Sequence, residues 1–156
     1  MIIILLIIGL LLDGLLTSCI PNTSFFIPLI TISNIFLIYN FYKKNERTYF
    51  ILIALTGLIY DMLYTNLFLF HLIIFSVIGV LSKYIYKYFK VTKVKILFFI
   101  PLIIASFELL TASTLFLFQI IPLDISRLTY KISHSLILNI IYAEIIYLSF
   151  EKIKKA

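Results

Sequence analysis

Long hydrophobic stretches separated by short polar segments make up almost the whole of this chain of 156 residues. Each stretch approaches the length of about 20 apolar residues that a helix needs to cross a bilayer. The polar breaks lie at residues 21–24, 43–47, 65–66, 83–95 and 122–131. The pattern predicts an all-α polytopic membrane protein, a six-transmembrane-helix bundle with spans at 2–20, 25–42, 48–66, 68–89, 95–121 and 132–150.

The composition strengthens the membrane assignment. Hydrophobic residues make up 63% of the chain and its mean hydropathy is +1.15, whereas soluble domains are about 45–50% apolar. Six spans use nearly all the residues, so we expect a single integral membrane domain, 1–156. The single Cys19 excludes an internal disulfide, and no Cys and His cluster predicts a metal or cofactor. The sequence shows no nucleophile motif and no glycine-rich phosphate loop, so we expect no enzymatic activity.

The positive charges predict how the chain lies in the membrane. In the bacterial plasma membrane, Lys and Arg concentrate in the cytoplasmic connections. We therefore expect a multi-pass protein of that membrane with both its N- and C-termini inside, which leaves only Arg127 and Lys131 outside. The cytoplasmic basic residues are then Lys43, Lys44, Arg47, Lys83, Lys87, Lys90, Lys93, Lys95, Lys152, Lys154 and Lys155.

The same distribution bears on partners. The net charge of +6 arises from basic residues at helix ends, a pattern that favours membrane orientation over nucleic acid binding. One basic stretch, defined here as Lys83, Lys87, Lys90, Lys93 and Lys95, alternates with aromatic residues. Such a segment is typical of contact with membrane lipid headgroups, and a site for a cytoplasmic partner is the alternative.

Acidic residues occur inside the apolar stretches. Asp13, Asp61 and Glu108 are spaced 48 and 47 residues apart, and residues 9–17 (GLLLDGLLT) nearly repeat as residues 57–65 (GLIYDMLYT). A charged side chain at the centre of a membrane helix costs about 2.5–3.5 kcal/mol on insertion scales. Such residues either form a proton, ion or substrate pathway or bond a neighbouring helix and fix its packing. The lack of a Lys or Arg counter-ion within the stretches favours the structural role.

Other residues in the stretches are candidates for helix contacts. Glu144 is a further acid in the last stretch, and His71, a structural residue by its position near an interface, lies near the same membrane face as Asp61 and is a candidate partner for it. Small residues let helix backbones approach closely. The candidates for such packing are Gly9, Gly14, Ser18, Gly57 and Gly79.

The third and fourth stretches carry a family resemblance. Residues 56–65 (TGLIYDMLYT), then His71 and residues 78–83 (IGVLSK), resemble the MreD family of rod shape-determining proteins. That family shows a Gly-Leu-x-x-Asp stretch, a short turn, and a helix with a small residue before its basic end. Length, about six spans and an acid on the fifth helix, here Glu108, agree across the chain. The chain departs from the pattern where Phe70 precedes His71, since a polar Asn is expected there.

The resemblance implies a non-enzymatic scaffold of the bacterial cell-wall elongation complex. Its implied partners are an MreC-like protein and, through it, MreB and the peptidoglycan synthases. Asp61 and Glu108, reinforced by Asp13, would hold a lipid-embedded docking face for MreC, and the outer loop 122–131 would be the one sizeable contact surface outside the cell. The family is also similar to the substrate-binding membrane subunits of energy-coupling-factor vitamin transporters. A transporter subunit with a closed polar cavity is therefore the alternative function.

Overall fold

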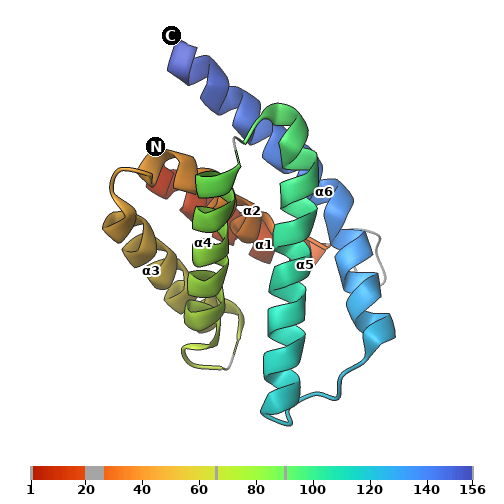
Figure 1. The fold of residues 1–156 in the computed structure, drawn as a ribbon. Helices are drawn as coiled ribbons and strands as arrows, with labels where there is room; N and C mark the ends of the chain where they lie inside the picture. The colour runs from red at the N-terminus through yellow and green to blue at the C-terminus, as the bar shows by residue number, and fades with distance from the viewer. Residues whose placement is uncertain (1, 20–26, 66, 90, 156) are drawn as a thin grey trace.

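The chain folds entirely into α-helices over the residues that the computed structural model describes, which are 2–19, 27–65, 67–89 and 91–155. No strand occurs in these residues, so the expected all-α fold is confirmed (Figure 1). The helices are α1 (Ile2–Cys19), α2 (Ile30–Tyr42), α3 (Glu46–Tyr64), α4 (Phe70–Tyr88), α5 (Lys93–Leu117) and α6 (Ile125–Lys155).

Helix α2 lies at the centre of the bundle. Its residues 30–39 are all buried, and it contacts each of the other five helices. A helix that is hydrophobic all round is buried on every side, and α2 (ITISNIFLIYNFY) has no charged face. The ring of Phe36 lies 5.0 Å from that of Tyr86 on α4 and 6.2 Å from that of Phe99 on α5.

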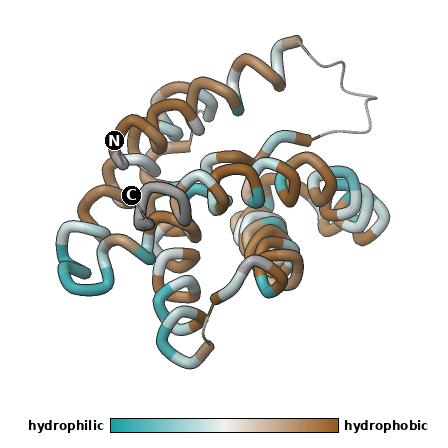
Figure 2. The backbone as a smooth tube through the Cα atoms, turned by 90° about the horizontal axis from the view of Figure 1, so that it is seen from above, coloured by the Kyte–Doolittle hydropathy of each residue, from teal (hydrophilic) through white to brown (hydrophobic). Residues whose placement is uncertain are grey.

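The last four helices form two antiparallel pairs beside α2. Helix α3 packs most extensively on α4, and α5 on α6. The C-terminal ends of α3 and α5 lie toward the bottom of Figure 1, and those of α4 and α6 toward the top. Figure 2 shows that hydrophobic residues cover most of each helix, while hydrophilic residues gather mainly at helix ends.

Helix α2 is shorter than the span expected at 25–42. It begins at Ile30 and has 13 residues, which extend about 20 Å against a hydrocarbon core about 30 Å thick. Pro28 disfavours helical backbone in the residue before it and supplies no N–H. Asp13 and Asn139 bond the first backbone N–H groups of α2 in place of a preceding helical turn.

The expected spans 95–121 and 132–150 also differ from the structure. Helix α5 ends at Leu117 and α6 already begins at Ile125, so the ten-residue outer loop expected at 122–131 is wrong. Most of that segment forms the first turns of α6.

Local backbone chemistry explains these two boundaries. Gln119 adopts a left-handed conformation (φ 57°), which ends the helical path of α5. Asp124 then starts α6, because its Oδ1 accepts a hydrogen bond from the backbone N–H of Arg127 (3.1 Å). An aspartate three residues before the bonded N–H is a recognisable helix start.

Three helices in the described residues are long and apolar enough to cross a membrane, namely Phe70–Tyr88, Val94–Leu117 and Ile125–Phe150. The helices Ile3–Cys19 and Ile30–Tyr42 are apolar but shorter. Helix α3 begins at Glu46, two residues before the expected start, because Asn45 accepts a hydrogen bond from the backbone N–H of Thr48 (3.4 Å).

Candidate functional site

Asp13 on α1 caps the N-terminus of α2. Its Oδ1 accepts a hydrogen bond from the N–H of Ile30 (2.7 Å) and its Oδ2 from that of Thr31 (3.0 Å), and the residue is 4% exposed. The start of a helix carries unpaired N–H groups and a partial positive charge, both of which favour a carboxylate. Asp13 supplies the cap that Leu29, the residue at the N-cap position of α2, does not.

Asp61 on α3 does the same for α4. The backbone N–H of His71, the second residue of α4, lies 2.9 Å from Oδ2 and 3.1 Å from Oδ1. The ring Nδ1 of His71 lies 2.7 Å from Oδ1, and the hydroxyl of Thr65 donates to the same oxygen (3.0 Å). The pair of His71 and Asp61 considered from the sequence is therefore present. Leu69, at the N-cap position, again provides no side-chain cap.

A glycine one turn before each aspartate lies where the next helix comes closest. A Cβ added to Gly57 would lie 2.6 Å from the Cα of Leu72 on α4. A Cβ added to Gly9 would lie 3.3 Å from the Cα of Thr31 on α2 and 2.5 Å from a side-chain nitrogen of that helix. In both pairs, the absence of a side chain lets the capped helix approach the aspartate.

The threonine that ends each motif completes the resemblance between the two pairs. Thr17 donates its hydroxyl to the carbonyl of Asp13 (2.6 Å), and Thr65 lies 3.4 Å from the carbonyl of Asp61. The repeated sequence at 9–17 and 57–65 thus corresponds to a repeated hairpin of two helices. In each, the glycine admits the second helix and the aspartate caps it.

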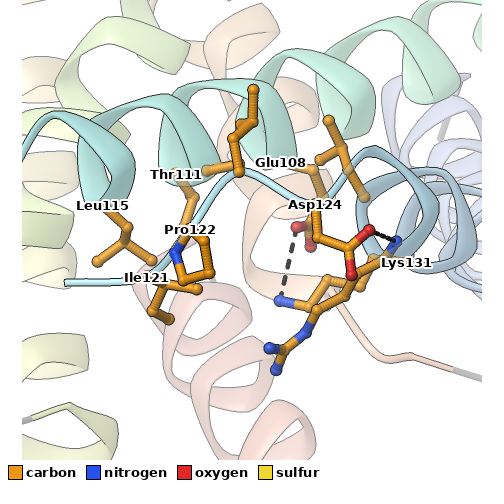
Figure 3. A pocket seen from close by; sticks show the side chains of 11 residues that line it. Glu108, Thr111, Leu115, Ile121, Pro122, Asp124 and Lys131 are labelled. Carbon is orange, nitrogen blue, oxygen red and sulfur yellow. Dashed lines mark hydrogen bonds and ion pairs between the residues drawn. The ribbon is translucent and has the colours of Figure 1, made fainter. Parts of the chain in front are cut away.

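Glu108 on α5 has different surroundings. It is 5% exposed, yet it accepts no hydrogen bond from the described residues, and the nearest cation is the Nζ of Lys131 on α6, 3.8 Å from Oε2. The two side chains point toward one another across the helix pair (Figure 3). The N-terminus of α6 is capped by Asp124 instead. Glu108 is therefore not used as a helix cap.

A pocket of about 70 Å³ opens beside Glu108. It lies between the C-terminal half of α5 and the start of α6, and Figure 3 shows both charged and apolar side chains around it. Its lining residues are Glu108, Thr111, Ala112, Leu115, Ile121, Pro122, Leu123, Asp124, Arg127, Leu128 and Lys131.

The remaining small residues and Glu144 are distributed over other helices. Gly14 faces α3, since an added Cβ would lie 2.7 Å from Cε1 of Tyr64, and an added Cβ at Gly79 would meet a side chain of α3. Ser18 is exposed and donates its hydroxyl within α1 (2.8 Å), so it is not brought against another helix. Glu144 is partly exposed and makes no hydrogen bond or ion pair with the described residues.

One member of the basic stretch joins α4 to α3. Lys83 donates to Oε2 of Glu46 (2.6 Å), and the hydroxyl of Tyr39 donates to Oε1 of the same side chain (3.0 Å). Two hydrogen bonds hold the pKa of Glu46 below its usual value. The bond from Lys83 has the larger effect and the bond from Tyr39 the next.

The other members of the basic stretch do not form one cluster in the part of the chain that the structure describes. The Nζ of Lys87 lies over the ring of Tyr88 (5.4 Å to the centroid), and Lys95 is exposed. Lys90 lies outside the described residues, as does the side chain of Lys93.

Two asparagines within the apolar stretches, which the sequence offers as possible bonds to a neighbouring helix, tie helices together. Asn139 on α6 accepts from the N–H of Leu29 (3.1 Å) and donates to the carbonyl of Ile27 (3.2 Å). Asn34 on α2 donates to a backbone carbonyl of α1 (2.8 Å) and accepts from the hydroxyl of Tyr142 on α6 (3.0 Å). Their signal in the sequence is a side-chain amide within an apolar stretch, which needs a partner when buried.

The chemistry of these groups is that of helix attachment. No group of three or more His, Cys, Asp and Glu is placed to hold a metal ion within the described ranges. Both oxygens of Asp13 and Asp61 bind backbone N–H groups, which fixes one helix on the next. Among the described residues, Glu108 alone keeps a buried carboxylate without hydrogen bonds beside an open pocket.

Comparison with protein families gives one decisive finding. The model of the family described as rod shape-determining protein MreD matches residues 1–155. The chain belongs to the MreD family. The match includes both repeated hairpins and the pair of α5 and α6. Comparison with curated proteins gives no match, and comparison with solved structures gives none either.

Membership of the MreD family defines the class of protein. It is a rod shape-determining membrane protein, from a family of shape-determining structural proteins. The long apolar helices α4, α5 and α6 agree with a membrane location. A role in cell shape connected with peptidoglycan synthesis and the elongation machinery is consistent with the family.

Proposed function

We propose that this MreD-family protein is a non-enzymatic scaffold of the cell-wall elongation complex in the bacterial plasma membrane. It would be one integral domain, 1–156, with six membrane-embedded helices and both termini in the cytoplasm. Its direct partner would be an MreC-like protein, which would link it to MreB and the peptidoglycan synthases. The observation that carries the proposal is the family match over residues 1–155.

The surroundings of the buried aspartates support a scaffold over a transport pathway. Groups that relay protons or bind a polar substrate in a membrane protein face a cavity or one another. Asp13 and Asp61 instead direct both oxygens to backbone N–H groups at the starts of α2 and α4. Each carboxylate then contributes to a fixed arrangement of helices, which is what a docking platform requires.

Helix α6 offers the face on which we propose that MreC docks. It is the least covered of the three helices that are long and apolar enough to span a membrane. Ile137, Ile141, Ile145 and Leu148 are exposed and recur at helical spacing, so they form one apolar stripe. Glu144 lies beside this stripe without a hydrogen bond among the described residues. A polar group on a partner's membrane helix would satisfy it.

Affinity recovery from native membranes tests the proposal. The tagged protein is captured after mild crosslinking, and its partners are identified by mass spectrometry. We expect MreC-like and wall-synthase proteins, with recovery of MreC lowered by Glu144→Ala but not by Ser149→Ala, a change at an exposed serine of the same helix. Capture of paired ATPases and a coupling membrane subunit would instead establish the transporter alternative.

A second variant tests the buried cap. Asp61→Leu leaves the start of α4 without its carboxylate, so we expect loss of MreC recovery and loss of rod shape in cells that depend on the variant. Met62→Leu is the matched control, because Met62 is the next residue and is 73% exposed. Normal rod shape and normal partner recovery with Asp61→Leu would refute the role of this cap in the scaffold.

A further inference from the structure

The pocket between α5 and α6 has features that a scaffold role does not use. We propose that it binds the headgroup of a zwitterionic phospholipid, with the lipid's primary ammonium at Glu108 and its phosphate at Arg127 and Lys131. This inference goes beyond the proposed function and concerns the isolated protein and the lipid around it.

The first observation is an unoccupied set of acceptors. Glu108 is only 5% exposed. Among the described residues its one charged neighbour is Lys131, whose Nζ lies 3.8 Å from Oε2, beyond hydrogen-bond distance. The hydroxyl oxygen of Thr111, another lining residue, is buried without a hydrogen-bond partner. Buried polar atoms are nearly always paired. A ligand with several N–H donors would pair both of these.

The second observation is a pair of cations at the same opening. Arg127 and Lys131 are four residues apart on α6, so they lie on one face of that helix and both line the pocket. The Lys131 side chain is 41% exposed and free to move toward a ligand. Guanidinium and ammonium groups bind phosphate oxygens by charge-assisted hydrogen bonds. Asp124 holds the start of this helix through the N–H of Arg127.

The mixture of charges selects the kind of headgroup. An anionic lipid without an amine would match Arg127 and Lys131 but would leave Glu108 without a donor. A single cationic side chain from a protein would match Glu108 but would bring no anion to the two basic residues, which have one further carboxylate, that of Asp124, in the pocket. An ammonium and a phosphate on one headgroup match both sets of charges. A primary ammonium brings three N–H donors to Glu108 and Thr111, whereas a trimethylammonium brings none.

The rim of the pocket explains why the ligand would be an amphiphile. Large apolar side chains around the ends of the two helices are exposed, including Phe116, Leu117, Leu123 and Ile125. Acyl chains can lie against these residues while the headgroup enters the charged pocket. A lipid bound in this way would lie at the C-terminal end of α5 and the N-terminal end of α6. In Figure 1 this is the side of the bundle opposite to the C-terminal end of α4.

Competition between lipids tests the proposal. The purified full-length protein is reconstituted in vesicles with equal amounts of dioleoyl phosphatidylethanolamine, phosphatidylcholine and phosphatidylglycerol. After mild detergent extraction, the lipids it retains are counted by native mass spectrometry. We expect phosphatidylethanolamine to be retained roughly threefold to fivefold over the other two, the ratio that a partly exposed ion pair gives.

Matched variants assign the preference to the pocket. Glu108→Gln should abolish it, because the amide lacks the charge, and Arg127→Gln combined with Lys131→Gln should lower retention of phosphatidylethanolamine. Glu144→Gln is the control, since Glu144 is another acid of the bundle but does not line the pocket. Circular dichroism and gel filtration confirm that each variant is folded. If Glu108→Gln does not fold, the Arg127→Gln change, at an exposed side chain, still tests the pocket.

Three results would overturn the proposal. Equal retention of the three lipids by the unaltered protein is one, and an unchanged preference in Glu108→Gln is another. A partner peptide crosslinked to Lys131 in native membranes, with no lipid preference, would assign the pocket to a protein instead. Because the lipid experiment uses the isolated chain, its failure is separate from any failure to recover MreC.

Discussion

Asp13, Asp61 and Glu108 lie on the first helix of three successive helix pairs, and the residue before the following helix explains why they behave differently. Helices α2 and α4 begin after leucines, which offer no side-chain acceptor. Asp13 and Asp61 therefore cap these helices from the preceding one. Helix α6 begins after Asp124, which accepts a hydrogen bond from its own first turn. A local cap thus leaves Glu108 available for another partner.

This difference predicts the order of three substitutions. Asp13→Leu and Asp61→Leu should each lower the free energy of unfolding by about 2–3 kcal/mol, because each leaves buried backbone N–H groups without an acceptor. Glu108→Leu should change it by less than about 1 kcal/mol, since an apolar side chain replaces a buried carboxylate that makes no hydrogen bond. Thermal unfolding in detergent, followed by circular dichroism, gives the order. A Glu108→Leu variant less stable than the other two would contradict this account of the caps.

At the scale of elements, the repeated hairpin was visible in the sequence only in part. The alignment of residues 9–17 with 57–65 marks the glycine, the aspartate and the threonine as related. It does not say which N–H groups the aspartates bind, because these belong to helices 10 to 18 residues further along the chain. Side-chain caps supplied from another helix lack the fixed spacing that makes local caps recognisable.

The glycines of the bundle should differ in their tolerance of a methyl group. Gly57→Ala places a Cβ 2.6 Å from the backbone of α4, whereas Gly79→Ala places one 2.8 Å from Cδ1 of Ile53, the flexible end of a side chain. We expect Gly57→Ala to destabilise the protein by about 1–3 kcal/mol through overpacking. Gly79→Ala should be close to neutral, because rearrangement of Ile53 is offset by the better helix propensity of alanine.

Thermal unfolding of both alanine variants in the same detergent checks this prediction. Gly57 and Gly79 lie on the two helices of one hairpin, so each is the control for the other. Equal stability of the two variants would mean that α3 and α4 approach one another less closely at Gly57 than the structure shows.

At the scale of the whole molecule, hydropathy predicted the all-α class but not which helix lies at the centre. Helix α2 has no charged residue, which favours burial, but α1 is also apolar apart from Asp13. The buried amide of Asn34 depends on contacts with α1 and α6, and no local period encodes those contacts. The pocket at Glu108 was missed for a related reason. The polar pattern predicts a loop at 122–131, whereas residues 125–131 form a helix that brings Arg127 and Lys131 onto one face.

The orientation of the bundle can be tested with introduced cysteines, because the chain has a single native one to remove. In a Cys19→Ser background, cysteines introduced as Lys87→Cys and Arg127→Cys lie near opposite ends of the bundle. With both termini inside, we expect a membrane-impermeant maleimide to label position 127 in intact cells or spheroplasts. Position 87 should be labelled only after permeabilisation. The reverse pattern would place the termini outside.

The bond between Asn139 and the start of α2 has a consequence for biogenesis. The two groups are separated by 110 residues, and a chain made from its N-terminus presents α2 to the membrane long before α6 exists. Until then, the N–H of Leu29 lacks the side-chain acceptor that it has in the finished protein. Helix α6, which is made after α1 to α5, therefore supplies an acceptor that the start of the central helix α2 needs. A product truncated before Asn139 would leave the N–H of Leu29 without this acceptor inside the bundle. Membrane proteases could use this unpaired group to distinguish an unfinished chain from a finished one.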